Sequence, residues 1–275
     1  MSYAPDLLDG MDRLILVLGA TGSTGRRVAG RLAQQGHPVR RASRSGDVRF
    51  DWTDRDTWRP TLAGTHAVYL MAPHELPIDP AFVHEAVDQG VRRIVLLSSR
   101  GIEEMGDERL LAAERDLKAS GADWTIVRAD WFDQNFDEGF FRPAVEAGAL
   151  AVPLGDTPQA FVDADDIAAV AAVALTTPGH EGRTYEVTGP RALSFAEAFA
   201  LIGEAAGRRL AFDGTPDGYR AQQRGLGMPA EQTEGEIAAF ARLRPATTTE
   251  AVPEVTGRTA IDFADYATRV WGPVR

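Results

Sequence analysis

The sequence contains no cysteine and a single lysine, Lys118. Without thiols the chain can form no disulfide and can use no thiolate as a nucleophile or metal ligand. No apolar run approaches the roughly 18 residues that would cross a membrane, and the N-terminus lacks the basic and then apolar pattern of a signal peptide. We therefore expect a soluble, cytoplasmic protein with no membrane partner.

Basic residues are also in deficit, because 29 of them stand against 40 acidic residues and the formal net charge is −11. Such a chain would repel a polyanion, so no nucleic-acid partner is expected. Hydrophobic residues make up 44% of the chain, which is enough for a substantial core. This composition favours a small-molecule partner.

Short apolar segments alternate along the chain with segments of helical periodicity. This alternation is typical of strands joined by helices, and it predicts a parallel sheet with helices on both faces. The apolar segments are almost continuous, as expected for strands that are buried on both sides. The expected class is α/β, a doubly wound Rossmann sheet with strands at about 14–18, 38–42, 48–50, 67–71, 93–97, 124–128 and 184–187.

After Pro190 the pattern changes to amphipathic helices that are separated by glycine and proline. The sequence predicts a loose N-terminal extension (1–12), a dinucleotide-binding domain (13–189) and a smaller, mainly helical segment (190–275). Residues 130–160 are expected to contribute to a substrate cleft that the last segment covers. A monomer and a homodimer are both compatible with this organisation.

Three glycines follow the first predicted strand at three-residue spacing, Gly19, Gly22 and Gly25. In a doubly wound sheet the loop after the first strand meets the phosphates of the ligand. Glycine removes Cβ atoms there, so the backbone N–H groups at the start of the next helix can approach a pyrophosphate. Because the triplet lies between a strand and a helix, it indicates a dinucleotide-binding turn rather than a turn built for packing alone. Further hydroxyl donors are available from Thr21, Ser23 and Thr24.

The end of the second predicted strand is basic, with Arg40, Arg41, Ser43 and Arg44 and no carboxylate before Asp47. An NAD site usually places Asp or Glu here to bind the ribose 2′-hydroxyl. A guanidinium instead pairs with a 2′-phosphate, and a serine can donate to it. The pattern predicts NADP(H), with Arg44 as the main contact; solvated surface arginines are the alternative.

The ends of the later strands supply further candidate contacts to the dinucleotide at the same edge of the sheet. For the large apolar side chains among them, ordinary core packing is the alternative. These candidates are Asp51, Trp52, Met71, Ala72, Pro73 and Ser98.

Several segments carry a family resemblance: GATGSTGRRVAGRLAQQGHPVRRASR, VRFDW, VYLMAP, RIVLLSS, WTIVRADWFDQNF and FVDADDIAAVAAVAL. Together they resemble the NmrA-like, atypical short-chain dehydrogenases over most of residues 13–190. VRFDW, VYLMAP and WFDQNF are most similar to reductases of ergot-alkaloid biosynthesis, of the festuclavine and agroclavine synthase type. The resemblance implies a Rossmann fold, a bound dinucleotide and a substrate cleft between the sheet edge and the C-terminal segment.

Short-chain dehydrogenases that reduce ketones use a Tyr-x-x-x-Lys pair to pass a proton to the alkoxide, and in extended members a glutamate often follows one helical turn later. When Glu114 is aligned with that glutamate, Leu110 occupies the lysine place and Gly106 the tyrosine place. Both catalysts are then absent, and Glu114 is expected to form an exposed i,i+4 ion pair with Lys118. An iminium carbon needs no such acid, because hydride converts it into a neutral amine; quinones and other activated acceptors are the alternatives.

The stretch after the sixth predicted strand faces the expected nicotinamide. Asp130 or Asp133 could stabilise a cation, although capping of the following helix also explains Asp130. The other catalytic candidates are Trp131, Ser99 and His74, a potential proton donor. The aromatic side chains could line a pocket or form interdomain core. The substrate candidates are Trp131, Phe132, Asn135, Phe136 and Phe161.

Asp163, Asp165 and Asp166 open a predicted helix, and capping and the helix dipole explain them, so no metal is expected. The sequence predicts an NADPH-dependent reductase of a small, hydrophobic, imine-type or otherwise activated acceptor in secondary metabolism. Two alternatives stay open. One is a non-catalytic NADP(H)-binding sensor of the NmrA type, and the other is a redox-neutral isomerase or cyclase on the same fold.

Overall fold

The centre of the protein is a parallel sheet of seven strands. It is seen in a computed structural model that describes residues 13–73 and 76–273. The strand order is β3-β2-β1-β4-β5-β6-β8, and every neighbouring pair is parallel. The chain reverses its direction of travel across the sheet between β1 and β4, and the carboxyl ends of strands at such a point are where doubly wound sheets usually bind their ligand. The strands are β1 (Ile15–Leu18), β2 (Val39–Ser43), β3 (Val48–Arg49), β4 (Ala67–Met71), β5 (Arg93–Ser99), β6 (Asp123–Ala129) and β8 (Arg183–Val187).

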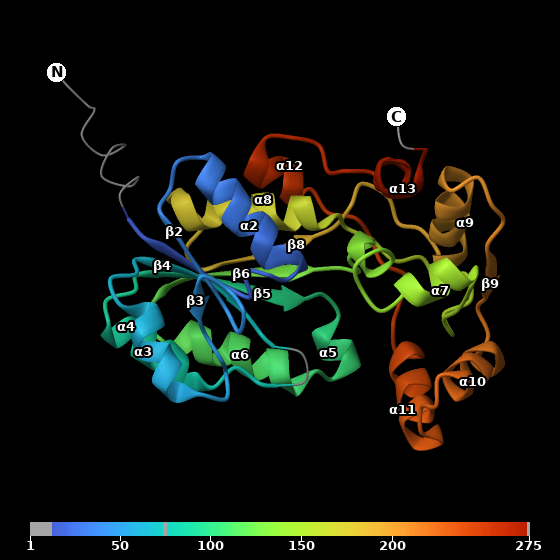
Figure 1. The fold of residues 1–275 in the computed structure, drawn as a ribbon, viewed down its shortest axis with the longest axis horizontal. Coiled ribbons are helices and arrows are strands. Elements are labelled where there is room, and N and C mark those ends of the chain that lie inside the picture. Colours follow the sequence, from blue (N-terminus) through green and yellow to red (C-terminus); the bar gives the residue numbers. More distant parts are fainter. Residues whose placement is uncertain (1–12, 74–75, 274–275) are drawn as a thin grey trace.

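Helices cover both faces of this sheet (Figure 1). One face carries α2 (Ser23–Gln34), α8 (Ala164–Thr176) and α12 (Ala251–Thr256). The other face carries α3 (Trp58–Leu62), which follows the short η1 (Arg55–Thr57), together with α4 (Pro80–Asp88) and α6 (Glu108–Ala119). The four-residue α5 (Ile102–Met105) lies between β5 and α6.

Alternate residues of the strands pack into two separate cores. In β1, Ile15 and Val17 join the core under α2 and α8, whereas Leu16 and Leu18 join the core over α4 and α6. All four side chains are buried, which explains why the strand reads as a continuous apolar run.

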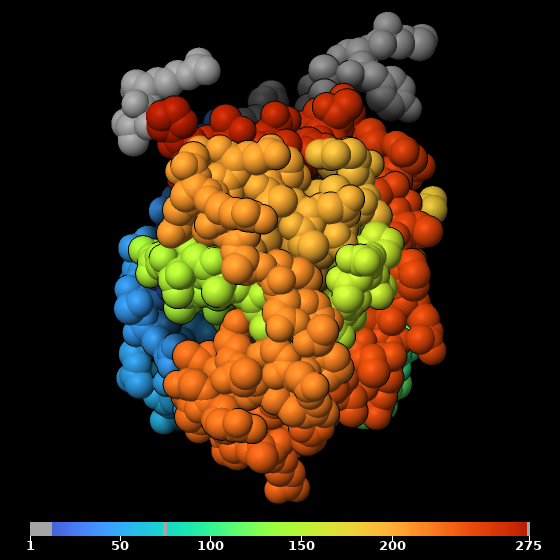
Figure 2. Space-filling model, turned by 90° about the vertical axis from the view of Figure 1, so that its right-hand side faces the viewer, coloured from blue at the N-terminus to red at the C-terminus, as the bar shows by residue number. Residues whose placement is uncertain are grey.

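The rest of the chain forms a smaller, mainly helical part at the end of the sheet (Figure 1). It has its own core, in which Phe136, Phe195, Phe199 and Tyr266 are fully buried. Figure 2 shows this end of the molecule, where the orange residues of the C-terminal segment lie above, below and between two exposed patches of light-green residues. The elements are η2 (Asp133–Asn135), α7 (Arg142–Ala147), β7 (Ala149–Ala151), α9 (Phe195–Ala205), β9 (Ala211–Asp213), α10 (Pro216–Gly225), α11 (Ala230–Phe240) and α13 (Phe263–Trp271).

The predicted fold class is confirmed, while two details differ from the expectation. The segment α12 does not join the covering part, because Ala251 and Val252 pack into the core under α8. The parallel pair β7 and β9 was not predicted, since each strand has three residues and its partner lies far away in the sequence. None of the helices in the described residues is long and apolar enough to cross a membrane.

Candidate cofactor and substrate site

The glycine turn after β1 allows α2 to approach the strand closely. Gly19 has φ 64°, a left-handed conformation that favours glycine. A Cβ atom on Gly25 would lie 2.2 Å from the carbonyl oxygen of Gly19, so this position has no room for a side chain. The Gly22 N–H donates to the Gly19 carbonyl at 2.8 Å and closes the turn.

The N-terminus of α2 is open to an anion. Gly22 is its N-cap residue, no side chain caps it and its first turn carries no acidic residue. By contrast, α4 and α8 are capped by the carboxylates of Asp79 and Asp163. The uncapped N–H groups and the helix dipole fit a pyrophosphate, as the glycine triplet predicts.

The hydroxyls near this turn differ in their availability. Thr21 is exposed, whereas Thr24 is buried. The Ser23 hydroxyl donates to Glu138 at 2.7 Å, and the same carboxylate binds the guanidinium groups of Arg26 and Arg27. Although burial raises it, these hydrogen bonds lower the pKa of Glu138 to about 2. The cluster ties the segment between η2 and α7 to the helix that would carry the pyrophosphate.

The residues predicted to contact the 2′-phosphate lie at the end of β2 and in the turn that follows it. The side chains of Arg41 and Arg44 are exposed, and Ser43 is buried beside the turn that follows. Arg40 is used otherwise, because its guanidinium donates to the carbonyl oxygens of Thr61 and Ala63 at 2.7 and 2.6 Å. Arg41, Ser43 and Arg44 therefore stay the candidates for a ribose 2′-phosphate, with Arg44 in the turn just after the strand.

The other predicted dinucleotide contacts lie at the ends of their strands with different surroundings. The Met71 side chain lies over Gly19, with its sulfur 3.0 Å from the position of a Cβ there. Trp52 is half-buried and packs edge-on against Phe50 and Phe82. Asp51 accepts hydrogen bonds from Thr53, which lower its pKa. Ala72 and Pro73 are half-buried after β4, and Ser98 is buried.

Ser98 is part of a buried ionic group that corrects the expectation for Glu114. The Glu114 side chain is 3% exposed and accepts hydrogen bonds from Ser98 at 2.7 Å and from Arg128 at 2.8 and 2.7 Å. Lys118 contacts the same carboxylate at 3.4 Å. The predicted i,i+4 pair with Lys118 is present, but the expectation that Glu114 is exposed was wrong, because Glu114 faces the sheet and its main partner is Arg128. Burial raises the pKa of Glu114, but the bonds from Arg128 and Ser98 lower it further than burial raises it.

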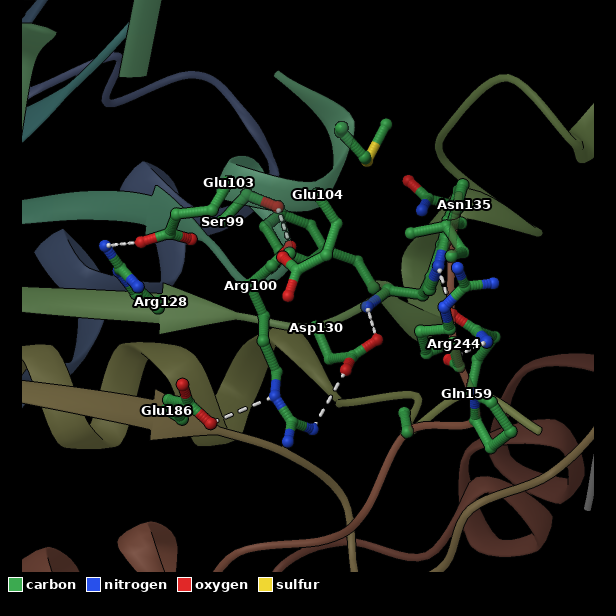
Figure 3. Close-up of a pocket in the computed structure, with 17 residues that line it drawn as sticks. Ser99, Arg100, Glu103, Glu104, Arg128, Asp130, Asn135, Gln159, Glu186 and Arg244 are labelled. Atoms are coloured by element: carbon green, nitrogen blue, oxygen red, sulfur yellow. Dashed lines mark hydrogen bonds and ion pairs between the residues drawn. The ribbon is translucent and has the colours of Figure 1, made fainter. Parts of the chain in front are cut away.

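A cavity of about 480 Å³ lies at the carboxyl ends of β5 and β6 (Figure 3). Ser99, Asp130, Trp131, Phe132 and Asn135, all predicted from the sequence, line it. The prediction overlooked the residues that other segments bring to the same cavity, because nothing in the local pattern marks them. The overlooked charged residues are Arg100, Glu103, Glu104, Arg128, Glu186 and Arg244.

Asp130 has little freedom to bind a ligand. Its carboxylate accepts the N–H of Trp131 at 2.8 Å and a guanidinium hydrogen bond from Arg100 at 3.3 Å. Burial raises the pKa of Asp130, while Arg100 and the Trp131 N–H oppose this rise. Arg100 also binds Glu186 at 3.1 Å, and this network holds the ends of β5, β6 and β8 together.

Trp131 forms the aromatic wall of the cavity. Its indole N–H donates to Gln159 at 3.2 Å, and its ring stacks on Phe141 and Phe240. Phe136 and Phe161 do not line the cavity. They are buried in the core behind Trp131, so the interdomain-core alternative applies to them.

Among the remaining candidates, Asp133 is 1% exposed and lies in this core instead of the cavity. Neither oxygen of its carboxylate has a hydrogen-bond partner among the described residues. Burial raises the pKa of Asp133 well above its ordinary value, and the neighbouring Asp163 and Asp166 raise it further. The hydroxyl of Ser99 donates to the Arg100 carbonyl at 3.1 Å. His74 lies outside the described residues.

The aspartates at the start of α8 have structural partners. Asp163 caps the helix through the N–H of Asp165 and pairs with Arg269, and Asp166 accepts the N–H of Ile261 at 2.7 Å. Within residues 13–73 and 76–273, no group of three or more His, Asp or Glu side chains could hold a metal ion.

The doubly wound sheet, the uncapped α2 and the adjoining cavity define a dinucleotide-binding Rossmann protein. The chain belongs to the family described as NAD(P)H-binding, whose model matches residues 19–178. It is an NAD(P)H-dependent oxidoreductase. Its fold is shared by NmrA, in agreement with the resemblance noted in the sequence. The prediction of a nicotinamide dinucleotide cofactor is confirmed at this level.

Three curated relatives illustrate the similarity. A (4-alkanoyl-5-oxo-2,5-dihydrofuran-3-yl)methyl phosphate reductase of Streptomyces griseus is 36% identical over 92% of this chain and 96% of its own. An NAD(P)H azoreductase of Xenophilus azovorans is 32% identical over 92% and 96%. Festuclavine synthase II of Penicillium roqueforti is 33% identical over 71% and 75%, in line with the resemblance noted in the sequence.

Solved structures share the fold. An NADPH-dependent quinone oxidoreductase from Escherichia coli, complexed with NADPH, superposes with a TM-score of 0.73 at 20% identity over 94% of this chain and 100% of its own. NmrA, a negative transcriptional regulator, in complex with NADP, gives 0.70 at 16% identity over 95% and 96%.

Proposed function

We propose that the protein is an NADPH-dependent reductase that transfers hydride to a small activated acceptor, with an iminium as the favoured class. The observation that supports this proposal is the chemistry of the cavity. Its described lining contains no tyrosine, lysine or histidine, and Ser99 carries its only hydroxyl. The places aligned with the Tyr-Lys pair hold Gly106, which ends α5 with φ 68°, and the buried Leu110.

Reduction of a simple ketone builds negative charge on oxygen, which an enzyme must neutralise with a proton or a positioned donor. An iminium takes hydride and becomes a neutral amine, so it needs neither. Bound NADPH supplies the hydride. The chain would hold its pyrophosphate at α2 and its 2′-phosphate at Arg44 and Ser43, while Trp131 and Phe132 exclude water from the cavity.

The names of the relatives favour an enzyme over a sensor. One is named a reductase of a dihydrofuranyl methyl phosphate and another an azoreductase. The charged lining also refines the sequence-based expectation of a hydrophobic substrate, because Arg100, Glu103 and Glu186 stand beside the aromatic wall.

Consumption of NADPH with matched acceptors tests the proposal. The panel is a cyclic N-alkyl iminium, menadione, a cyclic enone and a simple cyclic ketone, followed by the loss of reduced-nicotinamide absorbance. We expect the highest kcat/KM for the iminium and no turnover of the ketone. Ser99→Ala should lower quinone reduction by at least about tenfold more than iminium reduction. The Ser99 hydroxyl can donate a hydrogen bond to the weakly basic hydroquinone oxyanion, whereas it is too weak an acid to protonate the alkoxide formed from a ketone, and the iminium develops no negative charge.

Two results would overturn the proposal. Ketone reduction at the rate of iminium reduction would show that a proton donor is present. Tight NADPH binding without consumption by any acceptor would favour the sensor.

A further inference from the structure

Most charged side chains of the cavity have ion-pair partners. Glu103 pairs with Arg128 at 2.8 Å, and Asp130 and Glu186 share Arg100 at 3.3 and 3.1 Å. These carboxylates are already engaged by guanidinium groups, although Asp130 and Glu186 share a single one and so keep a net negative charge beside the cavity.

Two charged lining residues have no such ion-pair partner. Within the described part of the chain, the Glu104 carboxylate and the Arg244 guanidinium have no hydrogen bond or ion pair, although both border the cavity. Figure 3 labels both residues, Glu104 beside Glu103 and Arg244 beside Gln159. One is an unpaired negative charge and the other an unpaired positive charge.

The two residues come from segments that the fold brings together. Glu104 lies on α5, with its carboxylate 3.9 Å from the position of a Cβ at Gly101, just after the end of β5. Arg244 follows α11 in a segment that crosses to the sheet. There Gln159 donates to the Arg244 carbonyl at 3.3 Å, and the Leu243 side chain lies 3.8 Å from the same Gly101 position.

Glu104 is better placed than Asp130 to bind the ligand cation that the sequence suggested for Asp130. A cation beside Asp130 would have to compete with the Arg100 guanidinium and the Trp131 N–H. Glu104 has no such competitor, so a ligand cation can pair with it directly. Arg244 likewise has a free guanidinium, which suits a carboxylate or phosphate.

We propose that the cavity selects a substrate of mixed charge, with a cationic electrophile beside Glu104 and a carboxylate or phosphate beside Arg244. This inference rests on the proposed function, because it names the substrate class of the same site. One relative is named a reductase of a methyl phosphate, which agrees with an anionic group on a substrate of this family.

Binding of unreactive probes to the NADPH-loaded protein tests the inference. The probes are 4-(trimethylammonio)benzoate, which carries both charges, phenyltrimethylammonium as the cation and benzoate as the anion. Calorimetry should show the tightest binding for the first. Glu104→Gln should weaken the cation and the mixed-charge probe by about five- to tenfold and spare benzoate, and Arg244→Gln should weaken benzoate and the mixed-charge probe and spare the cation.

Glu108→Gln is the matched control, because Glu108 is exposed on the neighbouring α6, pairs with Arg115 and lies outside the cavity. It removes the same charge and should change each Kd less than about twofold. The inference fails if Glu104→Gln and Arg244→Gln act no more strongly than this control, or if each weakens all three probes equally. Because the probes cannot be reduced, this outcome is independent of whether any acceptor is turned over, which decides the proposed function separately.

Discussion

Replacing Gly25 with alanine tests the contact on which the cofactor turn depends. The new Cβ would lie 2.2 Å from the Gly19 carbonyl oxygen and 2.7 Å from its carbon, both of them backbone atoms. Ordinary contacts begin at 3.4 Å, so α2 and the end of β1 must separate by about 1 Å. Overpacking costs about 1–3 kcal/mol, and a backbone contact as short as 2.2 Å belongs at the upper end of this range, so the cost exceeds the gain of about 1 kcal/mol from replacing a helical glycine by alanine.

Two measurements follow from this change. A net loss of about 2 kcal/mol corresponds to a fall in Tm of about 4–8 °C for a chain of this size. The N–H groups of α2 would also move relative to β1 by about 1 Å, and displacements of this size can weaken a binding or catalytic site by an order of magnitude or more. The Kd for NADPH, measured by fluorescence titration, should therefore rise at least about tenfold.

Gly30→Ala is the matched control in the same helix. A Cβ at Gly30 meets no atom within 4 Å, so the substitution should raise the Tm slightly through helix propensity and leave NADPH binding unchanged. If Gly25→Ala keeps the parental Tm and NADPH affinity, or if both variants lose affinity equally, the close approach of α2 to β1 does not build the phosphate site.

Three further predictions concern cofactor choice and buried charges. Arg44→Gln should raise the Kd for NADPH at least about tenfold and spare NADH, because it removes a charge-assisted hydrogen bond to the 2′-phosphate; equal losses in a fluorescence titration would contradict this assignment. Burial raises the pKa of Asp133, so its contribution to stability is present in acid and is lost as the pH rises through that pKa. In urea unfolding, Asp133→Asn should therefore raise the free energy of unfolding at neutral pH but not at a pH of about 4. An increase that is the same at both pH values would contradict this prediction. Glu114→Ala should lower the free energy of unfolding by about 2–4 kcal/mol, because it leaves Arg128, 16% exposed, with only an exposed carboxylate as partner. Glu146→Ala, which breaks an exposed pair, should cost less than about 0.5 kcal/mol in the same assay, and similar losses for both would refute the difference.

The sequence predicted the sheet and the cofactor turn because both depend on local patterns. Val17 and Leu18 belong to a continuous apolar run, because both faces of a parallel strand are buried. Gly25 marks the position where α2 contacts the end of β1. The basic character of the end of β2 was also evident from the sequence. Only the tertiary structure shows that Arg44 is exposed while Arg40 binds the carbonyls of Thr61 and Ala63 at the end of α3.

The charge state of the cavity was decided only by the tertiary structure. The i,i+4 spacing predicted that Glu114 pairs with Lys118. In the structure β6 also places Arg128 against the Glu114 carboxylate. Glu104 and Arg244 are far apart in the chain, and their importance depends on which neighbouring charges find partners. Local periodicity determines which elements form, but ion pairing depends on distances between residues that the sequence does not place side by side.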